Sequence, residues 1–136
     1  MTENRRRWPA AGSALLLAAG LALAACGPAA GAGGVTPADV LARIERGNAP
    51  LLLDVRTPGE FATGHLPGAV NIPLDALAER LDGLGRALDR EVVVYCERGP
   101  RAAKAAASLA AAGFSVVRHL EGHMSGWRDA GLPVAK

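Results

Sequence analysis

The chain has 136 residues, with 15 lysines and arginines against 13 aspartates and glutamates, and only two cysteines. A chain of this length has room for one domain. Setting aside Glu3 and the arginines at positions 5–7 leaves 12 basic and 12 acidic residues. No cluster of basic residues with interleaved aromatic side chains remains, so the composition argues against a nucleic-acid partner.

The first 25 residues have the order of a bacterial secretory signal. Three arginines (5–7) precede an apolar run (14–25) that is shorter than the roughly 20 residues a membrane-spanning helix needs. The end of the run, LAAC at positions 23–26, resembles the lipobox of bacterial lipoproteins. We therefore expect residues 1–25 to be a lipoprotein signal peptide and Cys26 to carry lipid. An ordinary signal peptide followed by a chance cysteine is the alternative.

Lipidation of Cys26 would anchor an exported protein to a bacterial membrane, on its periplasmic or extracytoplasmic face. Residues 27–34, GPAAGAGG, have no charge and no apolar period, which is typical of a flexible tether. The expected division is thus signal peptide 1–25, lipidated cysteine and tether 26–34, and folded domain 35–136. Cys96 would then be the only thiol of the mature protein, which excludes an internal disulfide and a cysteine metal site.

From position 35 onward the chain alternates between helical and extended patterns. Thr36, Pro37 and Asp39 predict the start of a helix that ends before Gly47. Apolar runs predict strands at 51–55, 69–72, 91–95 and 115–119, and the segments between them predict helices at 58–63, 74–84 and 101–112. This alternation predicts an α/β fold with a mainly parallel sheet of four to five strands and helices on both faces.

Cys96 stands at the end of the strand predicted to be central, because residues 92–95 show no polar alternation. Ligands of parallel sheets bind beyond the carboxyl ends of the strands, and a loop entering a helix points N–H groups inward. That helix terminus, with Arg98 and Arg101, would favour the thiolate, which is the nucleophilic form of cysteine. Glu97 opposes this but would cost little if it pointed outward. The alternative is a small apolar residue that ends a buried strand.

The segment CERGPR, from Cys96 to Arg101, resembles the C-x-x-G-x-R active-site loop of rhodanese domains. Three other stretches are similar to that family in the same order: LLLDVRTPGEF at 51–61, GHLPGAVNIP at 64–73 and LEGHMSGW at 120–127. The similarity covers residues 35–134. Four matching stretches in order make a single rhodanese-like domain the expected fold.

The resemblance implies a cofactor-free sulfurtransferase of the thiosulfate sulfurtransferase type. Cys96 would take a sulfane sulfur from a small anionic donor and pass it from a persulfide to cyanide, a thiol or a partner protein. The loop residues Glu97, Arg98, Gly99, Arg101 and Ala102 would bind the donor. A structural Arg101 that pairs with Asp54 is equally open.

Several other polar residues are predicted to be scaffold. Asp54, Arg56 and Glu60 are interpreted as a local ion-pair network, and His65 as a hydrogen-bonded structural histidine. Trp127 is expected to pack the last helix onto the sheet. No three ligands have metal-binding spacing, and His119 and His123 form only a weak pair.

Two residues depart from the family pattern. Pro100 removes one N–H from the loop. His123 occupies a position near the active-site mouth that is usually glycine, so its backbone must tolerate histidine or the local geometry must differ. These departures keep open a non-catalytic module for sulfur relay or partner binding at the membrane. A phosphatase or arsenate reductase is disfavoured because only four residues separate Cys96 from Arg101, and no second reducing cysteine is present.

Overall fold

A computed structural model describes residues 33–136 of the chain. The predicted signal peptide, the lipidated cysteine at position 26 and nearly all of the predicted tether lie outside these residues. Within residues 33–136, no helix is both long enough and apolar enough to span a membrane.

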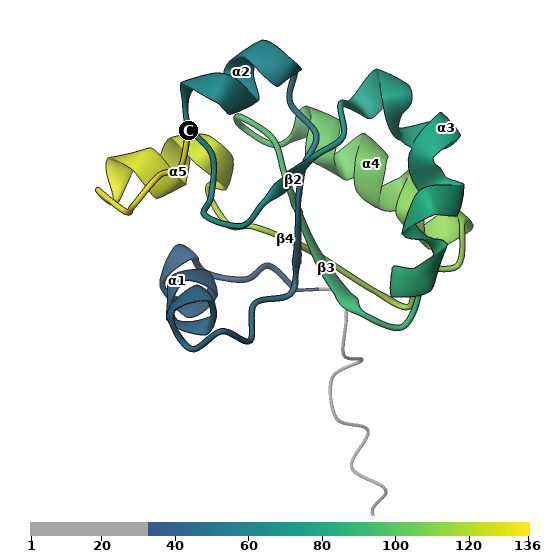
Figure 1. The fold of residues 1–136 in the computed structure, drawn as a ribbon, viewed down its shortest axis with the longest axis horizontal. Coiled ribbons are helices and arrows are strands. Elements are labelled where there is room, and N and C mark those ends of the chain that lie inside the picture. Colours follow the sequence, from purple (N-terminus) through teal and green to yellow (C-terminus); the bar gives the residue numbers. More distant parts are fainter. Residues whose placement is uncertain (1–32) are drawn as a thin grey trace, which may run out of the picture.

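Four parallel strands form the centre of the domain (Figure 1). They are β1 (Leu51–Asp54), β2 (Val70–Asn71), β3 (Glu91–Tyr95) and β4 (Val116–His119), in the spatial order β2-β1-β3-β4. A single parallel bridge between Val35 and Leu120 continues the pairing just beyond β4. The predicted parallel sheet is therefore confirmed. Strand β2 is two residues long, shorter than predicted, and pairs only with β1 at the edge of the sheet.

Helices cover both faces of the sheet, as predicted. Helices α1 (Pro37–Glu45) and α5 (His123–Asp129) lie on one face, while α3 (Leu74–Leu84) and α4 (Pro100–Ala111) lie on the other (Figure 1). Helix α2 (Pro58–Thr63) lies beyond the end of β1, and a short 3-10 turn (Gly85–Ala87) follows α3. Helix α4 begins one residue earlier than predicted, because Pro100 fits the first helical position, where no N–H is needed.

The strand alternation divides the core into two layers. Val92 and Val94 point into the layer under α3 and α4, whereas Val93 and Tyr95 point into the layer under α1 and α5. Trp127 is fully buried in the second layer, and its indole N–H donates to the Pro133 carbonyl at 2.8 Å. The prediction that Trp127 packs the last helix onto the sheet is confirmed. The two filled layers hold the carboxyl end of β3, and therefore Cys96, in a fixed place.

Candidate active site

Cys96 begins a tight turn between β3 and α4. Its Sγ accepts the Gly99 N–H at 3.0 Å, and only 1% of the residue is exposed. Gly99 has φ 132°, a conformation that side-chain-bearing residues rarely adopt. Pro100 follows and has no N–H to offer. The turn therefore folds its own backbone onto the sulfur, with the Gly99 N–H as the donor that reaches it.

The start of α5 supports this turn from the other side. The Met124 N–H donates to the Cys96 carbonyl at 3.0 Å, and the Ser125 N–H donates to the Glu97 carbonyl at 3.1 Å. The Cys96 N–H in turn donates to Nδ1 of His123 at 3.4 Å. His123 has φ 53°, so the backbone here does hold histidine in the left-handed region. The structure therefore places His123 beside the Cys96 turn, through a bond to Cys96 for which the sequence gave no signal.

Arg101, at the start of α4, is held by Glu60 of α2. Nη1 and Nη2 of the guanidinium donate to the two carboxylate oxygens at 2.7 and 2.8 Å. The Arg101 hydrogen bonds, assisted by Thr57, lower the pKa of Glu60 to about 2, and the same pair raises the pKa of Arg101. This contribution to stability is present above the ordinary carboxyl pKa and is lost as the pH falls toward 2. The predicted alternative pair of Arg101 with Asp54 is wrong.

Asp54 is unavailable to Arg101 because it is bound to Arg56. Both side chains are essentially buried, and Arg56 donates to the carboxylate through Nε at 3.1 Å and Nη2 at 2.7 Å. Nη2 also donates to the Gly64 carbonyl at 2.8 Å. Burial acts to lower the pKa of Arg56, but the hydrogen bonds and charge of Asp54 outweigh it and the pKa is raised. The predicted network is thus split: Asp54 pairs with Arg56, and Glu60 pairs with Arg101.

The remaining loop residues occupy different surroundings. The Glu97 carboxylate is not free in solvent, since it pairs with Arg56 at 3.4 Å and with Arg128 of α5. The sequence gave no sign of Arg128, which lies 31 positions away. Arg98 is exposed, and Ala102 is buried in the core beside Cys96. The structure thus brings Glu97, Gly99 and Arg101 around the turn but places Ala102 in the packing beneath it.

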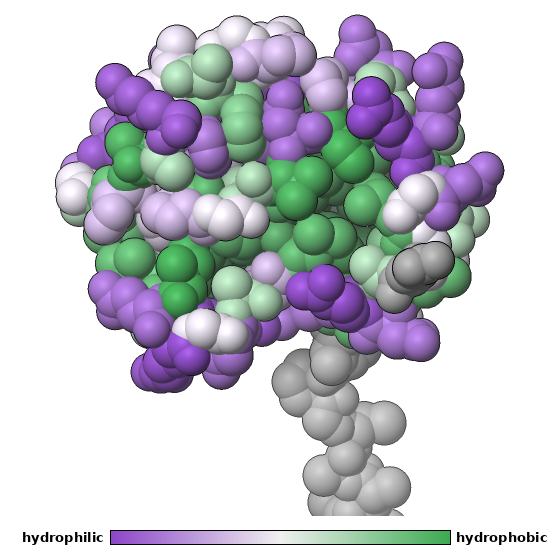
Figure 2. Space-filling model, in the orientation of Figure 1, coloured by the Kyte–Doolittle hydropathy of each residue, from purple (hydrophilic) through white to green (hydrophobic). Residues whose placement is uncertain are grey.

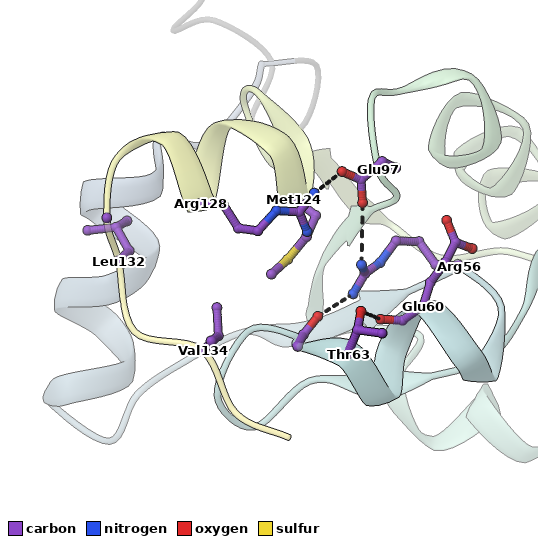
Figure 3. A pocket seen from close by; sticks show the side chains of 10 residues that line it. Arg56, Glu60, Thr63, Glu97, Met124, Arg128, Leu132 and Val134 are labelled. Atoms are coloured by element: carbon purple, nitrogen blue, oxygen red, sulfur yellow. Dashed lines mark hydrogen bonds and ion pairs between the residues drawn. The ribbon is translucent and has the colours of Figure 1, made fainter.

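A cavity of about 500 Å³ opens beside Glu97 (Figure 3). Arg56, Glu60, Glu97 and Arg128 supply its charges, and Met124, Leu132 and Val134 its apolar surface. A smaller cavity of about 290 Å³ is lined by Val55, Thr57, Pro73, Leu74, Asp75 and Arg101. Glu60 lines the first cavity and Arg101 the second, so their ion pair lies between the two. On the face shown in Figure 2, apolar residues gather centrally between polar margins.

His65 has the structural role that the sequence predicts. Its Nδ1 lies 2.9 Å from the Phe61 carbonyl, and its ring stacks on that of Phe61 with centroids 3.5 Å apart. Within residues 33–136, no three histidine, cysteine, aspartate or glutamate side chains are grouped as metal ligands. The groups that the structure brings together at this end of the sheet are one thiol, backbone N–H groups and paired charges.

The residues that build this turn lie within a segment, 36–130, that matches the family model described as the rhodanese-like domain. The chain belongs to this family. The structure of this chain is similar to that of a thiosulfate sulfurtransferase from Pseudomonas aeruginosa, with a TM-score of 0.69 and 32% sequence identity. That match covers 78% of this chain and 20% of the other.

The sequence relatives of this chain differ in length, so the matching segment is a different share of each relative. A sulfurtransferase from Allochromatium vinosum is 38% identical over 84 residues, which are 62% of this chain and 77% of the relative. An HTH-type transcriptional regulator from Mycobacterium tuberculosis is 43% identical over 102 residues, which are 74% of this chain but only 43% of the regulator. The family and its sulfurtransferase members support sulfur transfer as the general activity.

Proposed function

We propose that the chain moves a sulfane sulfur from thiosulfate or another persulfide donor to a thiophilic acceptor, through a persulfide on Cys96. The observation that carries this proposal is the contact between the Gly99 N–H and Sγ of Cys96 at 3.0 Å, at the carboxyl end of β3. An N–H aimed at sulfur stabilises the anionic form that attacks. Cys96 is also the one cysteine within residues 33–136.

The reaction is a double displacement. The Cys96 thiolate attacks the outer sulfur of thiosulfate, a new S–S bond forms, and the S–S bond of thiosulfate breaks with its electron pair leaving on sulfite. Cyanide or a thiolate then attacks the outer sulfur of the persulfide. The product is thiocyanate or a new persulfide, and the Cys96 thiolate is restored as the leaving group. No external oxidant is consumed in either step.

The direct test is to load the folded domain and count the sulfur. The domain is incubated with thiosulfate and its mass is measured for one added sulfur on Cys96. Cyanide is then added, and thiocyanate is measured together with the loss of the added mass. An unchanged mass with every donor tried, including a protein persulfide, would contradict the proposal.

Glu60→Gln is expected to lower the KM for thiosulfate, because Arg101 would then be free to bind an anionic donor. Glutamine retains an acceptor oxygen for the Thr57 N–H, so the capping box of α2 survives. The pair is about one-third exposed at each side chain. A partly exposed pair is worth up to ~1 kcal/mol, which corresponds to a change in KM of up to about fivefold. The measurement is steady-state thiocyanate production at several thiosulfate concentrations.

Arg101→Ala is the matched variant for this prediction, and its KM should rise. The KM values of the two variants should change in opposite directions, whereas a general loosening of the site would change both in the same direction. An unchanged KM in both would show that the Arg101–Glu60 pair is purely structural. Because the pKa of Glu60 is lowered to about 2, the contrast should persist throughout the neutral range.

A second candidate is a module that relays sulfur between proteins or binds a partner without turning over small donors. The pairing of Arg101 with Glu60 favours it, because the guanidinium N–H groups that would hold a small anionic donor already donate to a carboxylate. The regulator from M. tuberculosis, in which the similar segment is less than half the chain, is consistent with such use. The two candidates separate on one measurement: only the enzyme produces thiocyanate from free thiosulfate and cyanide.

We further propose that Cys26 is the lipid anchor, placing the domain outside the bacterial cytoplasm. The basic residues at 5–7, the apolar run and LAAC at 23–26 support this proposal. Cys26→Ala should leave sulfur transfer unchanged and move the protein out of the membrane fraction. The measurement is fractionation with activity assays, together with the mass of the N-terminal peptide. A wild-type N-terminus without lipid would contradict the anchor.

A further inference from the structure

His123 has a backbone conformation that histidine seldom adopts. It is the first residue of α5, with φ 53°, and it follows Gly122 at φ 71°. A non-glycine residue in this region is strained and persists only where its surroundings hold it there. A glycine would be free of that strain. We therefore expect the histidine side chain to make a contact that glycine at this position could not make.

The imidazole ring bonds to the Cys96 turn on one side and lies against Gly99 of the turn on the other. Nδ1 accepts the Cys96 N–H at 3.4 Å. On the far side of the ring, Nε2 lies 3.2 Å from the place that a Cβ on Gly99 would occupy. The same two residues close the turn through the Gly99 N–H and Sγ of Cys96. The ring therefore bonds to the Cys96 end of the turn and occupies the space that a side chain at the Gly99 end would need.

The geometry also fixes the protonation state of this ring. Because Nδ1 accepts a hydrogen bond, the imidazole must be neutral with its proton on Nε2. Burial, together with the nearby His119 ring of β4 at 6.2 Å between centroids, lowers the pKa of His123. In the loop that the ring contacts, the charged residue next to Cys96 is Glu97. Its carboxylate is paired with Arg56 and Arg128. A neutral ring is thus favoured near neutral pH.

We propose that His123 is a positioning residue of the active-site turn, with a neutral imidazole that keeps the Gly99 N–H aligned on the Cys96 sulfur. Its effect on sulfur transfer rests on the function proposed above, but its effect on thiol reactivity does not. A protonated ring cannot accept the Cys96 N–H. The alignment should therefore weaken as the pH falls through the titration of His123.

Two variants isolate the ring from the backbone strain. His123→Gly removes the ring and suits the left-handed conformation, whereas His123→Asn suits that conformation and keeps an acceptor oxygen close to where Nδ1 lies. The first readout is the rate at which iodoacetamide alkylates Cys96 in the folded domain, from about pH 5 to about pH 9. The second is the NMR shift of the Cys96 and Gly99 amides over the same range. Melting temperature is recorded for each variant.

His123→Gly should slow alkylation about three- to tenfold near neutral pH, as expected for one lost hydrogen bond, while its melting temperature stays equal or rises. His123→Asn should remain within about twofold of the wild-type rate. In the wild type, the Cys96 and Gly99 amide shifts should follow the titration of the His123 ring. That step should be missing from both variants.

Equal alkylation rates and equal loop amide shifts in the wild type and His123→Gly would overturn the proposal. So would a lower melting temperature in His123→Gly with an unchanged alkylation rate, which would make His123 a packing residue only. If the variants differ in alkylation as expected but no form acquires sulfur from any donor, the positioning role stands and the proposed function fails. The two inferences are therefore separately testable.

Discussion

Cys96→Ser is expected to abolish sulfur transfer completely while leaving the domain folded. Sulfur transfer requires an atom that attacks sulfane sulfur as an anion and then carries it, and a serine hydroxyl does neither near neutral pH. No other cysteine is present within residues 33–136 to replace it. Serine is nearly isosteric, and its hydroxyl can still accept the Gly99 N–H. The measurement is thiocyanate formation together with the mass of the protein after thiosulfate.

Lys104→Ala is a suitable control for this experiment. Lys104 is exposed on α4 and belongs to neither cavity, so its removal should change neither the activity nor the added sulfur mass. A serine variant that retained measurable thiocyanate production, or a wild type that gained sulfur at a residue other than Cys96, would contradict the assignment. A serine variant with a melting temperature many degrees lower would show that the thiol is needed for packing.

The parts of the fold that were predictable are those encoded by neighbouring residues. Thr57 and Glu60 lie three positions apart and form the reciprocal capping box that starts α2. The uninterrupted apolar run before Cys96 predicts a central strand, and β3 is paired on both sides. In both cases a few adjacent side chains decide the local conformation. The resemblance to rhodanese domains then indicated the family to which the fold belongs, whereas the spatial order β2-β1-β3-β4 came from the structure.

The charge pairing of the site was not predictable in the same way. Arg101 and Glu60 are 41 positions apart, and Glu97 and Arg128 are 31 positions apart. Several arginines and carboxylates converge on this end of the sheet, and each could satisfy more than one partner. The choice is made by α2 and α5, whose docking onto the sheet depends on the whole core. Sequence reasoning therefore left Arg101 open between binding a donor and pairing with Asp54, and did not find Glu60, the partner that the structure gives it.

The buried pair of Asp54 and Arg56 has the largest expected effect on stability. Asp54→Ala leaves the Arg56 guanidinium inside the protein without its principal partner, and removing one member of a buried pair costs about 3–5 kcal/mol. Arg56 has 1% exposure and Asp54 has none. Urea unfolding at neutral pH should show a correspondingly lower midpoint. Asp54→Asn, which keeps an acceptor oxygen, should fall between this variant and the wild type.

Two further variants distinguish the cost of leaving a buried charge unpaired from the cost of losing an ion pair. Arg43→Ala breaks the pair with Glu91, which has the same 2.7 Å separation but is partly exposed, at 28% and 21% of the two side chains, and should cost about 1 kcal/mol. Asp54→Ala combined with Arg56→Met removes both charges and should recover part of the loss, because no unpaired charge remains buried. A single Asp54 variant no less stable than Arg43→Ala would contradict this account. In that case Arg56 would have to be stabilised chiefly by the Gly64 carbonyl and Glu97, the other partners that it contacts.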